Sequence, residues 1–221
     1  HTHLQETQSE IEESIQKFGV TPIQRLSGLN ILGPNLLAAH CVFLSEQDLD
    51  LLALNNVCIS HNPSSNLKLG SGIADLTSMI EKGIGVSFGT DSSASNNRLD
   101  ILGEMRLASL MTKGKSGNPE ILTPIEVLRM ATIEGAKALG LESVTGSIEK
   151  NKKADIVAIN LDSIDLLPCF DPLSSLIYSA GRSDIDYVWV DGNIKLKENE
   201  LVNIDIDKLK FLAKSWQTKI Q

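Results

Sequence analysis

Residues 84–93 read Ile84-Gly85-Val86-Ser87-Phe88-Gly89-Thr90-Asp91-Ser92-Ser93. A short apolar run ends at a glycine, and a polar loop that contains an acid follows it. This pattern is typical of a buried strand of a parallel sheet, with a loop at its carboxyl end that leads into a helix. The sequence after the loop predicts that helix over about residues 99–113.

The same unit recurs three times before residue 84. Apolar runs at residues 1–4, 36–41 and 57–60 predict three more strands. Stretches with helical spacing or capping signals follow the first two runs, and the third is followed by a polar loop over residues 62–72 and a helix that ends at Gly83. Four strand–helix units make half of an eight-stranded barrel, which typically needs about 250 residues when complete.

The pattern changes towards the C-terminus. Thr123-Pro124 predicts the start of a helix that runs to Gly140. After Gly146, alternating apolar residues at 154–160 and 187–190, with a turn at Asp191-Gly192, predict a small β module. The last expected element is an amphipathic helix over residues 205–221, in which Trp216 is interpreted as a packing residue.

Composition narrows the classes of function. The 221 residues carry a net charge of −8, and their basic residues are scattered, which argues against a nucleic-acid partner. No apolar run approaches the 18 or more residues of a membrane span, and no secretion signal opens the sequence. Three widely spaced cysteines fit a reduced, cytoplasmic protein. A sequence that opens at His1-Thr2-His3, within an apparent site motif, is expected to be part of a longer protein.

Polar residues stand where the predicted strands end. In a parallel β/α barrel the active site lies at the carboxyl ends of the strands. His3 and Glu6 end the first strand, His40 ends the second, His61 ends the third and Asp91 follows the fourth. Two imidazoles and a carboxylate from different strands suit a Zn²⁺-class ion that keeps one position open for water.

Each of these residues also has a structural interpretation. A single histidine at a strand end is often only hydrogen-bonded, Asp91 could cap a turn, and Glu6 could interact with a helix N-terminus. Cys41 beside His40 could be a nucleophile with its base, but neighbouring strand residues point to opposite faces, which argues against that pairing. The coincidence of several such residues at strand ends favours the functional interpretation.

Several motifs resemble those of the amidohydrolase superfamily, and the most similar branch is that of the methylthioadenosine/S-adenosylhomocysteine deaminases. The motifs are His3-Leu4-Gln5-Glu6-Thr7, Ala39-His40, His61-Asn62-Pro63-Ser64-Ser65-Asn66-Leu67-Lys68-Leu69 and Gly89-Thr90-Asp91-Ser92-Ser93-Ala94-Ser95-Asn96-Asn97. Leu102-Gly103-Glu104-Met105-Arg106, Ala131-Thr132 and Gly146-Ser147-Ile148-Glu149 also look like that branch. The resemblance therefore runs over almost the whole sequence.

The resemblance implies an α/β fold in three parts. Residues 1–145 would be the C-terminal half of a metal-dependent (β/α)8 barrel. Residues 146–204 would be part of a small, composite β-sandwich domain, and residues 205–221 would be a C-terminal helix. The family's H-x-H ligand pair, on the first barrel strand, has no counterpart in this sequence. Either the sequence is therefore part of a longer protein, or the other half of the site is supplied separately.

The resemblance also implies roles for single residues. His3 and Asp91 would bind one divalent ion, zinc or else iron, and Asp91 would also accept a proton from the attacking water. His40 would contact the attacking hydroxide and stabilise the developing charge, and Glu6 would carry a proton to a ring nitrogen. Glu6 and His40 would thereby contact the substrate, and Asn66 and Ser92 are further candidates for substrate contact.

The implied reaction is hydrolytic deamination of a purine nucleoside derivative such as S-adenosylhomocysteine or methylthioadenosine, with release of ammonia. Similar proteins also suggest a homo-oligomer. Two alternatives remain open at this point. One is a guanine-type deaminase or chlorotriazine hydrolase with the same metal chemistry, and the other is a non-catalytic scaffold chain.

Overall fold

The first sheet of the computed structural model is parallel and four-stranded. The structure describes residues 1–220. The strands are β1 (Thr2–Leu4), β2 (Leu37–His40), β3 (Cys58–His61) and β4 (Gly85–Phe88), and they lie side by side in that order. All three pairs are parallel. Because all four strands run in the same direction, every carboxyl end lies at the same edge of the sheet.

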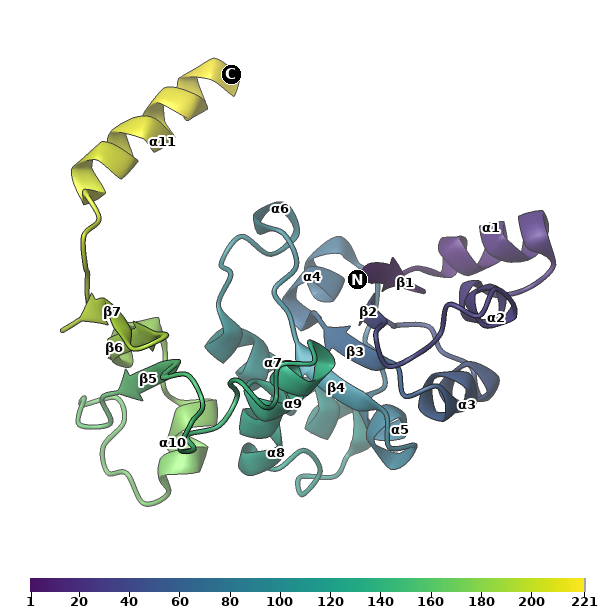
Figure 1. The fold of residues 1–221 in the computed structure, drawn as a ribbon, viewed down its shortest axis with the longest axis horizontal. Coiled ribbons are helices and arrows are strands. Elements are labelled where there is room, and N and C mark those ends of the chain that lie inside the picture. The colour runs from purple at the N-terminus through teal and green to yellow at the C-terminus, as the bar shows by residue number, and fades with distance from the viewer. Residues whose placement is uncertain (221) are drawn as a thin grey trace.

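Helices follow each strand and cover the sheet (Figure 1). After β1 come α1 (Gln8–Phe18) and α2 (Pro22–Gly28), after β2 comes α3 (Glu46–Leu54), and after β3 come α4 (Pro63–Leu69) and α5 (Leu76–Glu81). After β4 come α6 (Ser93–Asn96), α7 (Ile101–Ser116), α8 (Pro124–Met130) and α9 (Ile133–Ala138). Capping boxes begin α2 at Thr21 and α3 at Ser45, where the side chain of the cap residue and the side chain three positions later each bond to the other's backbone N–H.

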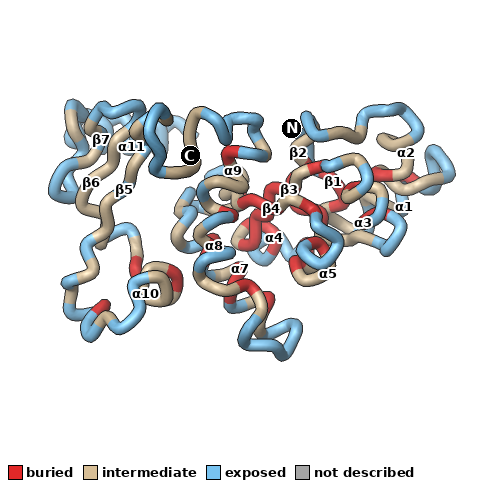
Figure 2. The backbone as a smooth tube through the Cα atoms, turned by 60° about the horizontal axis from the view of Figure 1, so that its bottom comes forward, coloured by how far each residue is buried: buried red, intermediate tan, exposed pale blue. Residues whose placement is uncertain are grey.

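The hydrophobic core lies between the parallel sheet and these helices. Ala38 and Ile59 on the central strands are fully buried, as are Leu52 of α3 and Ala108 of α7. Figure 2 shows this burial concentrated along the strands and on the inner sides of the helices. The residues at the strand ends are therefore attached to a tightly packed core.

Two elements differ from the sequence prediction. Residues 62–72 do not form a loop throughout, because α4 occupies the middle of this segment between Pro63 and the left-handed Gly70. Its inward face carries Ser65 and Asn66, which are polar, so the segment lacks the apolar spacing that predicts a helix. The single helix predicted to reach Gly140 is two helices instead. The break falls at Thr132, whose hydroxyl donates to the backbone oxygen of Leu128.

The second sheet is antiparallel. Its strands are β5 (Ile156–Ile159), β6 (Ile185–Val190), β7 (Asn193–Lys197) and β8 (Glu200–Leu201), paired in that order. The hairpin predicted at Asp191-Gly192 is confirmed, since both residues have positive φ and the flanking Val190 and Asn193 pair. Helix α10 (Pro172–Tyr178) and a short 3₁₀ turn, η1 (Arg182–Asp184), connect β5 to β6.

Helix α10 joins the second sheet to the first part of the chain. It packs against α7 and α8. Ile177 belongs to the same core cluster as the parallel sheet, and the hydroxyl groups of Tyr178 and Ser109 lie 3.0 Å apart. The two parts are therefore linked through one shared apolar contact region.

Truncation of Ile177 to alanine is expected to lower the free energy of unfolding by about 2–5 kcal/mol, because it opens a cavity in a fully packed region. Urea denaturation followed by circular dichroism measures the change. Ile164→Ala is the matched control, since Ile164 lies in the same connection but is 86% exposed and should change stability by less than about 0.5 kcal/mol. Equal effects of the two substitutions would contradict this assignment of the core.

The last helix, α11 (Ile206–Ile220), confirms the predicted element but not its predicted packing; Gln221 lies outside the described residues. In Figure 1 it reaches away from the second sheet, and it has no buried residue. Trp216 is 60% exposed, so its interpretation as a packing residue was wrong for the part of the chain described. No helix within residues 1–220 has both the length and the apolar character needed to cross a bilayer.

Candidate active site

Four predicted site residues lie together at the carboxyl edge of the parallel sheet. One ligand atom each from His3, His40 and Asp91 can be chosen so that all lie within 4.8 Å of one another. The Nε2 atom of His3 is 3.7 Å from Oδ1 of Asp91, and the rings of His3 and His40 meet edge to face. Oε2 of Glu6 lies 3.8 Å from Nε2 of His40. We refer to these four residues as the strand-end cluster.

The backbone turns sharply where these strands end. His40 has φ 72° and Asp91 has φ 56°, and Gln5, between His3 and Glu6, has φ 48°. Non-glycine residues rarely adopt this left-handed conformation, and it concentrates at functional sites. Gln5 is fully buried, and its amide accepts from the backbone of Ile23 and donates to that of Phe43, which fixes the first turn.

Asp91 is held through one of its two carboxylate oxygens. The hydroxyls of Ser65 and Ser95 both donate to Oδ2, which leaves Oδ1 facing His3. Burial alone would raise the pKa of Asp91, but the hydrogen bonds from Ser95 and Ser65 outweigh it and hold the pKa below its usual value. Asp91 is therefore ionised at neutral pH, with one oxygen available to a ligand.

His40 and Glu6 are each held from the side of α4. Nδ1 of His40 lies 2.7 Å from Oδ1 of Asn66, and both residues are buried. The hydroxyl of Ser71, just after α4, donates to Oε1 of Glu6. Nε2 of His40 is buried and has no hydrogen-bond partner among the described residues.

These features fit a divalent metal ion. Two imidazoles and a carboxylate form the nitrogen and oxygen donor set that zinc prefers. The buried, unpartnered Nε2 of His40 would be unfavourable unless a cation or water satisfied it. Ser65 and Asn66 hold Asp91 and His40 from outside, as residues behind metal ligands commonly do.

Two other predicted residues take no part in the cluster. His61 ends β3 and is buried, and burial lowers the pKa of its imidazole to about 3, so it is neutral. Cys41 is also buried, and burial raises the pKa of its thiol well above the usual range, which argues against a nucleophile. The three cysteines form no disulfide within residues 1–220, although Cys58 and Cys169 are only partly buried.

A cavity of about 340 Å³ opens beside the cluster. Its lining residues are His1, His3, Ala39, Ser60, Asn62, Gly89, Thr90 and Asp91. Gly89 is required there for steric reasons, because a Cβ at this position would overlap Oδ1 of Asn62 and lie 2.5 Å from Oγ of Ser60. The backbone can thus pass close to β3 on its way to Asp91.

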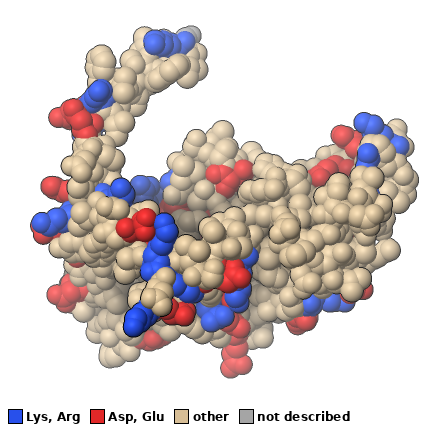
Figure 3. Space-filling view, in the orientation of Figure 1, with Lys and Arg blue, Asp and Glu red and all other residues tan. Residues whose placement is uncertain are grey.

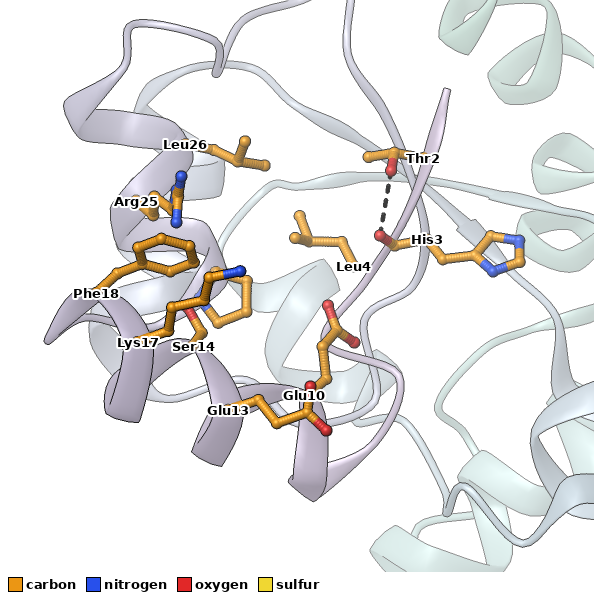
Figure 4. Close-up of a pocket in the computed structure, with 11 residues that line it drawn as sticks. Thr2, His3, Leu4, Glu10, Glu13, Ser14, Lys17, Phe18, Arg25 and Leu26 are labelled. Carbon is orange, nitrogen blue, oxygen red and sulfur yellow. Dashed lines mark hydrogen bonds between the residues drawn. The ribbon is translucent and has the colours of Figure 1, made fainter.

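A second cavity, of about 500 Å³, lies between β1 and the helices α1 and α2 (Figure 4). Leu26 and Phe18 line it, and Glu10 and Glu13 stand on α1 at its side. In Figure 4 the imidazole of His3 points away from these residues. His3 nevertheless belongs to both, because it also lines this cavity while its ring reaches Asp91 in the strand-end cluster.

Some residues that hold the site were assigned no role from the sequence. Glu104 of α7 is buried and accepts hydrogen bonds from the backbone of Ser64 and the side chain of Asn96. Ser71 reaches Glu6 across 65 positions of sequence. An acid within a helix and a serine in a polar segment carry no sequence signal for such roles.

Solved structures of other proteins share this fold. A crystal structure of an adenosine deaminase from Xanthomonas campestris with bound zinc matches with a TM-score of 0.96 and 37% identity, over 99% of this chain and 50% of that one. The zinc complex of atrazine chlorohydrolase from Arthrobacter aurescens matches with a TM-score of 0.91 and 29% identity, over 97% of this chain and 48% of that one.

Proteins similar in sequence include two named deaminases. A 5-methylthioadenosine/S-adenosylhomocysteine deaminase of Acetivibrio thermocellus is 45% identical over 97% of this chain and 50% of that protein. A 5'-deoxyadenosine deaminase of Methanosarcina acetivorans is 42% identical over 95% of this chain and 48% of that protein. The chain thus spans about half the length of these relatives. A family model described as the amidohydrolase family matches residues 1–195, and the chain belongs to that family.

Proposed function

We propose that the complete protein hydrolytically deaminates a purine nucleoside derivative such as S-adenosylhomocysteine or methylthioadenosine and releases ammonia. The observation that carries this proposal is the convergence of His3, Glu6, His40 and Asp91 at one edge of the sheet. The names of the similar deaminases support the substrate class. The activity is assigned to the complete protein because this chain spans half the length of those relatives.

His3 and Asp91 would hold one divalent ion, which we propose to be zinc, with iron as the other candidate. The zinc named with two similar crystal structures supports that choice. When bound, such an ion lowers the pKa of a coordinated water towards about 7 and so makes hydroxide available at neutral pH. The family's H-x-H pair would supply the remaining ligands.

The chain's own residues would then guide protons and orient the water. Asp91 is ionised and has Oδ1 free of serine hydroxyls, so it can accept a proton from the attacking water. Nε2 of His40 contacts the same water. Glu6, fixed by Ser71 through Oε1, presents Oε2 to carry a proton to the ring nitrogen.

We also propose the larger fold. Strands β1 and β4 are the edges of the described parallel sheet, so each has a free side on which further strands can pair. Residues 1–145 would form half of a metal-dependent (β/α)8 barrel. Residues 146–204 would complete a composite β-sandwich domain with strands from the other half, and residues 205–221 would be a C-terminal helix.

We further propose that Asn66 and Ser92 contact the substrate. We also propose that the complete protein is cytoplasmic, forms a homo-oligomer and has no nucleic-acid partner. On the face drawn in Figure 3, basic and acidic groups are interspersed. Ser92 is exposed, and its hydroxyl caps α6 by accepting from the backbone of Ser95.

A chlorotriazine hydrolase is the second candidate, supported by the TM-score of 0.91 with atrazine chlorohydrolase. Such an enzyme would use the same residues on a different ring. A scaffold without activity is disfavoured, because such a chain would have no need to keep four site residues converged.

The test is a substrate panel with the complete protein and its bound metal quantified. Ammonia release is measured with S-adenosylhomocysteine, methylthioadenosine, 5'-deoxyadenosine, adenosine and guanine, and chloride release with atrazine. We expect ammonia release from an adenosine derivative to be fastest. Chloride release alone would favour the triazine hydrolase, and a protein that binds no metal and releases neither product would support the scaffold.

A further inference from the structure

The contact between His40 and Asn66 determines which ring nitrogen of His40 carries a proton. Nδ1 of His40 lies 2.7 Å from Oδ1 of Asn66, and the exposed fractions of the two residues are 0% and 1%. An amide oxygen can only accept a hydrogen bond, so the imidazole must donate it. In the neutral ring the proton is then on Nδ1, and Nε2 has a free lone pair.

A cation bound at the strand-end cluster would favour this tautomer. Nε2 faces the strand-end cluster, 3.8 Å from Oε2 of Glu6, where the other groups are carboxylates and the imidazole of His3. A set of converging lone pairs is suited to a cation, and imidazoles at metal sites commonly donate their other N–H to an oxygen behind them. Either orientation of the Asn66 amide leaves one buried amide atom without a partner among the described residues, Nδ2 in the present orientation and Oδ1 in the opposite one. Only the present orientation leaves the lone pair of His40 Nε2 free to face a cation at the cluster.

Asn66 is itself fixed by α4. Its backbone N–H donates to Asn62, and its backbone oxygen accepts from Ser71. The backbone of the preceding Ser64 donates to the buried carboxylate of Glu104, which attaches α4 to α7. The amide therefore approaches His40 from a helix that is tied down on both sides.

The same segment also holds the other two groups. Ser65 donates to Asp91, Asn66 contacts His40, and Ser71 donates to Glu6. These three targets end or follow three different strands, whereas their partners lie within seven consecutive residues. Residues 65–71, which we call the positioning segment, thus set the relative orientation of Asp91, His40 and Glu6.

We propose that Asn66 is a positioning residue that holds His40 in the tautomer protonated on Nδ1, so that Nε2 presents a lone pair to the strand-end cluster. In this state Nε2 accepts a hydrogen bond from the attacking water and orients the water oxygen towards the substrate. The chemical role rests on the proposed function, but the tautomer does not. In this role Asn66 acts through His40, and the role does not depend on the separate proposal that Asn66 contacts the substrate.

The test is nitrogen NMR of the complete protein, labelled with ¹⁵N-histidine and loaded with zinc, at a pH at which His40 is neutral. The two signals that are missing from the spectrum of a His40→Gln variant belong to His40. We expect Nδ1 of His40 to resonate as a protonated nitrogen and Nε2 as an unprotonated one. A protonated Nε2 beside an unprotonated Nδ1 would overturn the proposal, whatever the protein's activity.

Three variants separate positioning from a merely structural role. Asn66→Asp keeps an acceptor and should keep the tautomer, whereas Asn66→Leu removes it and should shift the signals of both ring nitrogens. Ser64→Ala, in the same helix but without a side-chain hydrogen bond among the described residues, should leave them unchanged. A folded Asn66→Leu protein with the original signals would overturn the proposal. If this variant does not fold, the spectra of the original protein and of Asn66→Asp still decide.

Discussion

Replacing Glu6 with glutamine in the complete protein is expected to lower kcat for ammonia release about 10²–10⁴-fold, the range associated with loss of a proton carrier. Glutamine is nearly isosteric, and its oxygen can still accept the hydroxyl of Ser71. It cannot carry a proton to the ring nitrogen. Bound zinc should stay at the original stoichiometry, because Glu6 is not among the proposed ligands. Steady-state kinetics together with metal analysis measures both effects.

Glu12→Gln provides the matched control, since Glu12 lies on the exposed side of α1 and carries the same change of charge. This variant should retain the original rate. Should Glu6→Gln keep full activity, the proton-shuttle role is wrong. A loss of zinc in parallel with the loss of rate would instead place Glu6 among the metal ligands.

Replacing Gly89 with alanine is expected to lower the free energy of unfolding by about 1–3 kcal/mol and to weaken zinc binding. The added methyl group would overlap Asn62 and crowd Ser60 on the neighbouring strand. Both are buried, so the relief must come from movement of the backbone that leads to Asp91. Urea denaturation and competition with a zinc chelator measure the two effects.

Gly114→Ala is the control for this substitution. Gly114 lies on the exposed side of α7, where an added Cβ would meet no atom within 4 Å. Alanine there should stabilise the protein by about 0.5–1 kcal/mol, because it favours the helix. If Gly89→Ala behaves in the same way, the close approach to β3 has no energetic consequence and the steric argument fails.

The sequence predicted those parts of the fold that local patterns determine. The four parallel strands have continuous apolar runs, and the capped helix starts and the hairpin at Asp191-Gly192 depend on residues that are close in sequence. Helix α4 was not predicted because its buried face is polar. The break at Thr132 was not predicted because it depends on one side-chain hydrogen bond that competes with the helix. The exposure of Trp216 depends on what lies beside α11, which periodicity does not contain.

The candidate site, like the fold, could be predicted only in part from the sequence. His3, His40 and Asp91 could be grouped because parallel strands present their carboxyl ends at one edge, and the structure brings them together. The hydrogen bonds from Ser65 and Ser71 to the cluster cross 26 and 65 positions of sequence, so only the folded chain reveals them. Local residue type gives no indication of such partners.

The left-handed backbone conformation of His40 and Asp91 lowers stability at two positions that the proposed catalysis needs. Each is a side-chain-bearing residue in a conformation that is on the order of 1 kcal/mol unfavourable. Gly at His40 or Asp91 would relieve that strain and remove the chemistry in the same step. Laboratory evolution for heat resistance alone would therefore tend to erode these two positions, and a screen that also demands turnover would retain them.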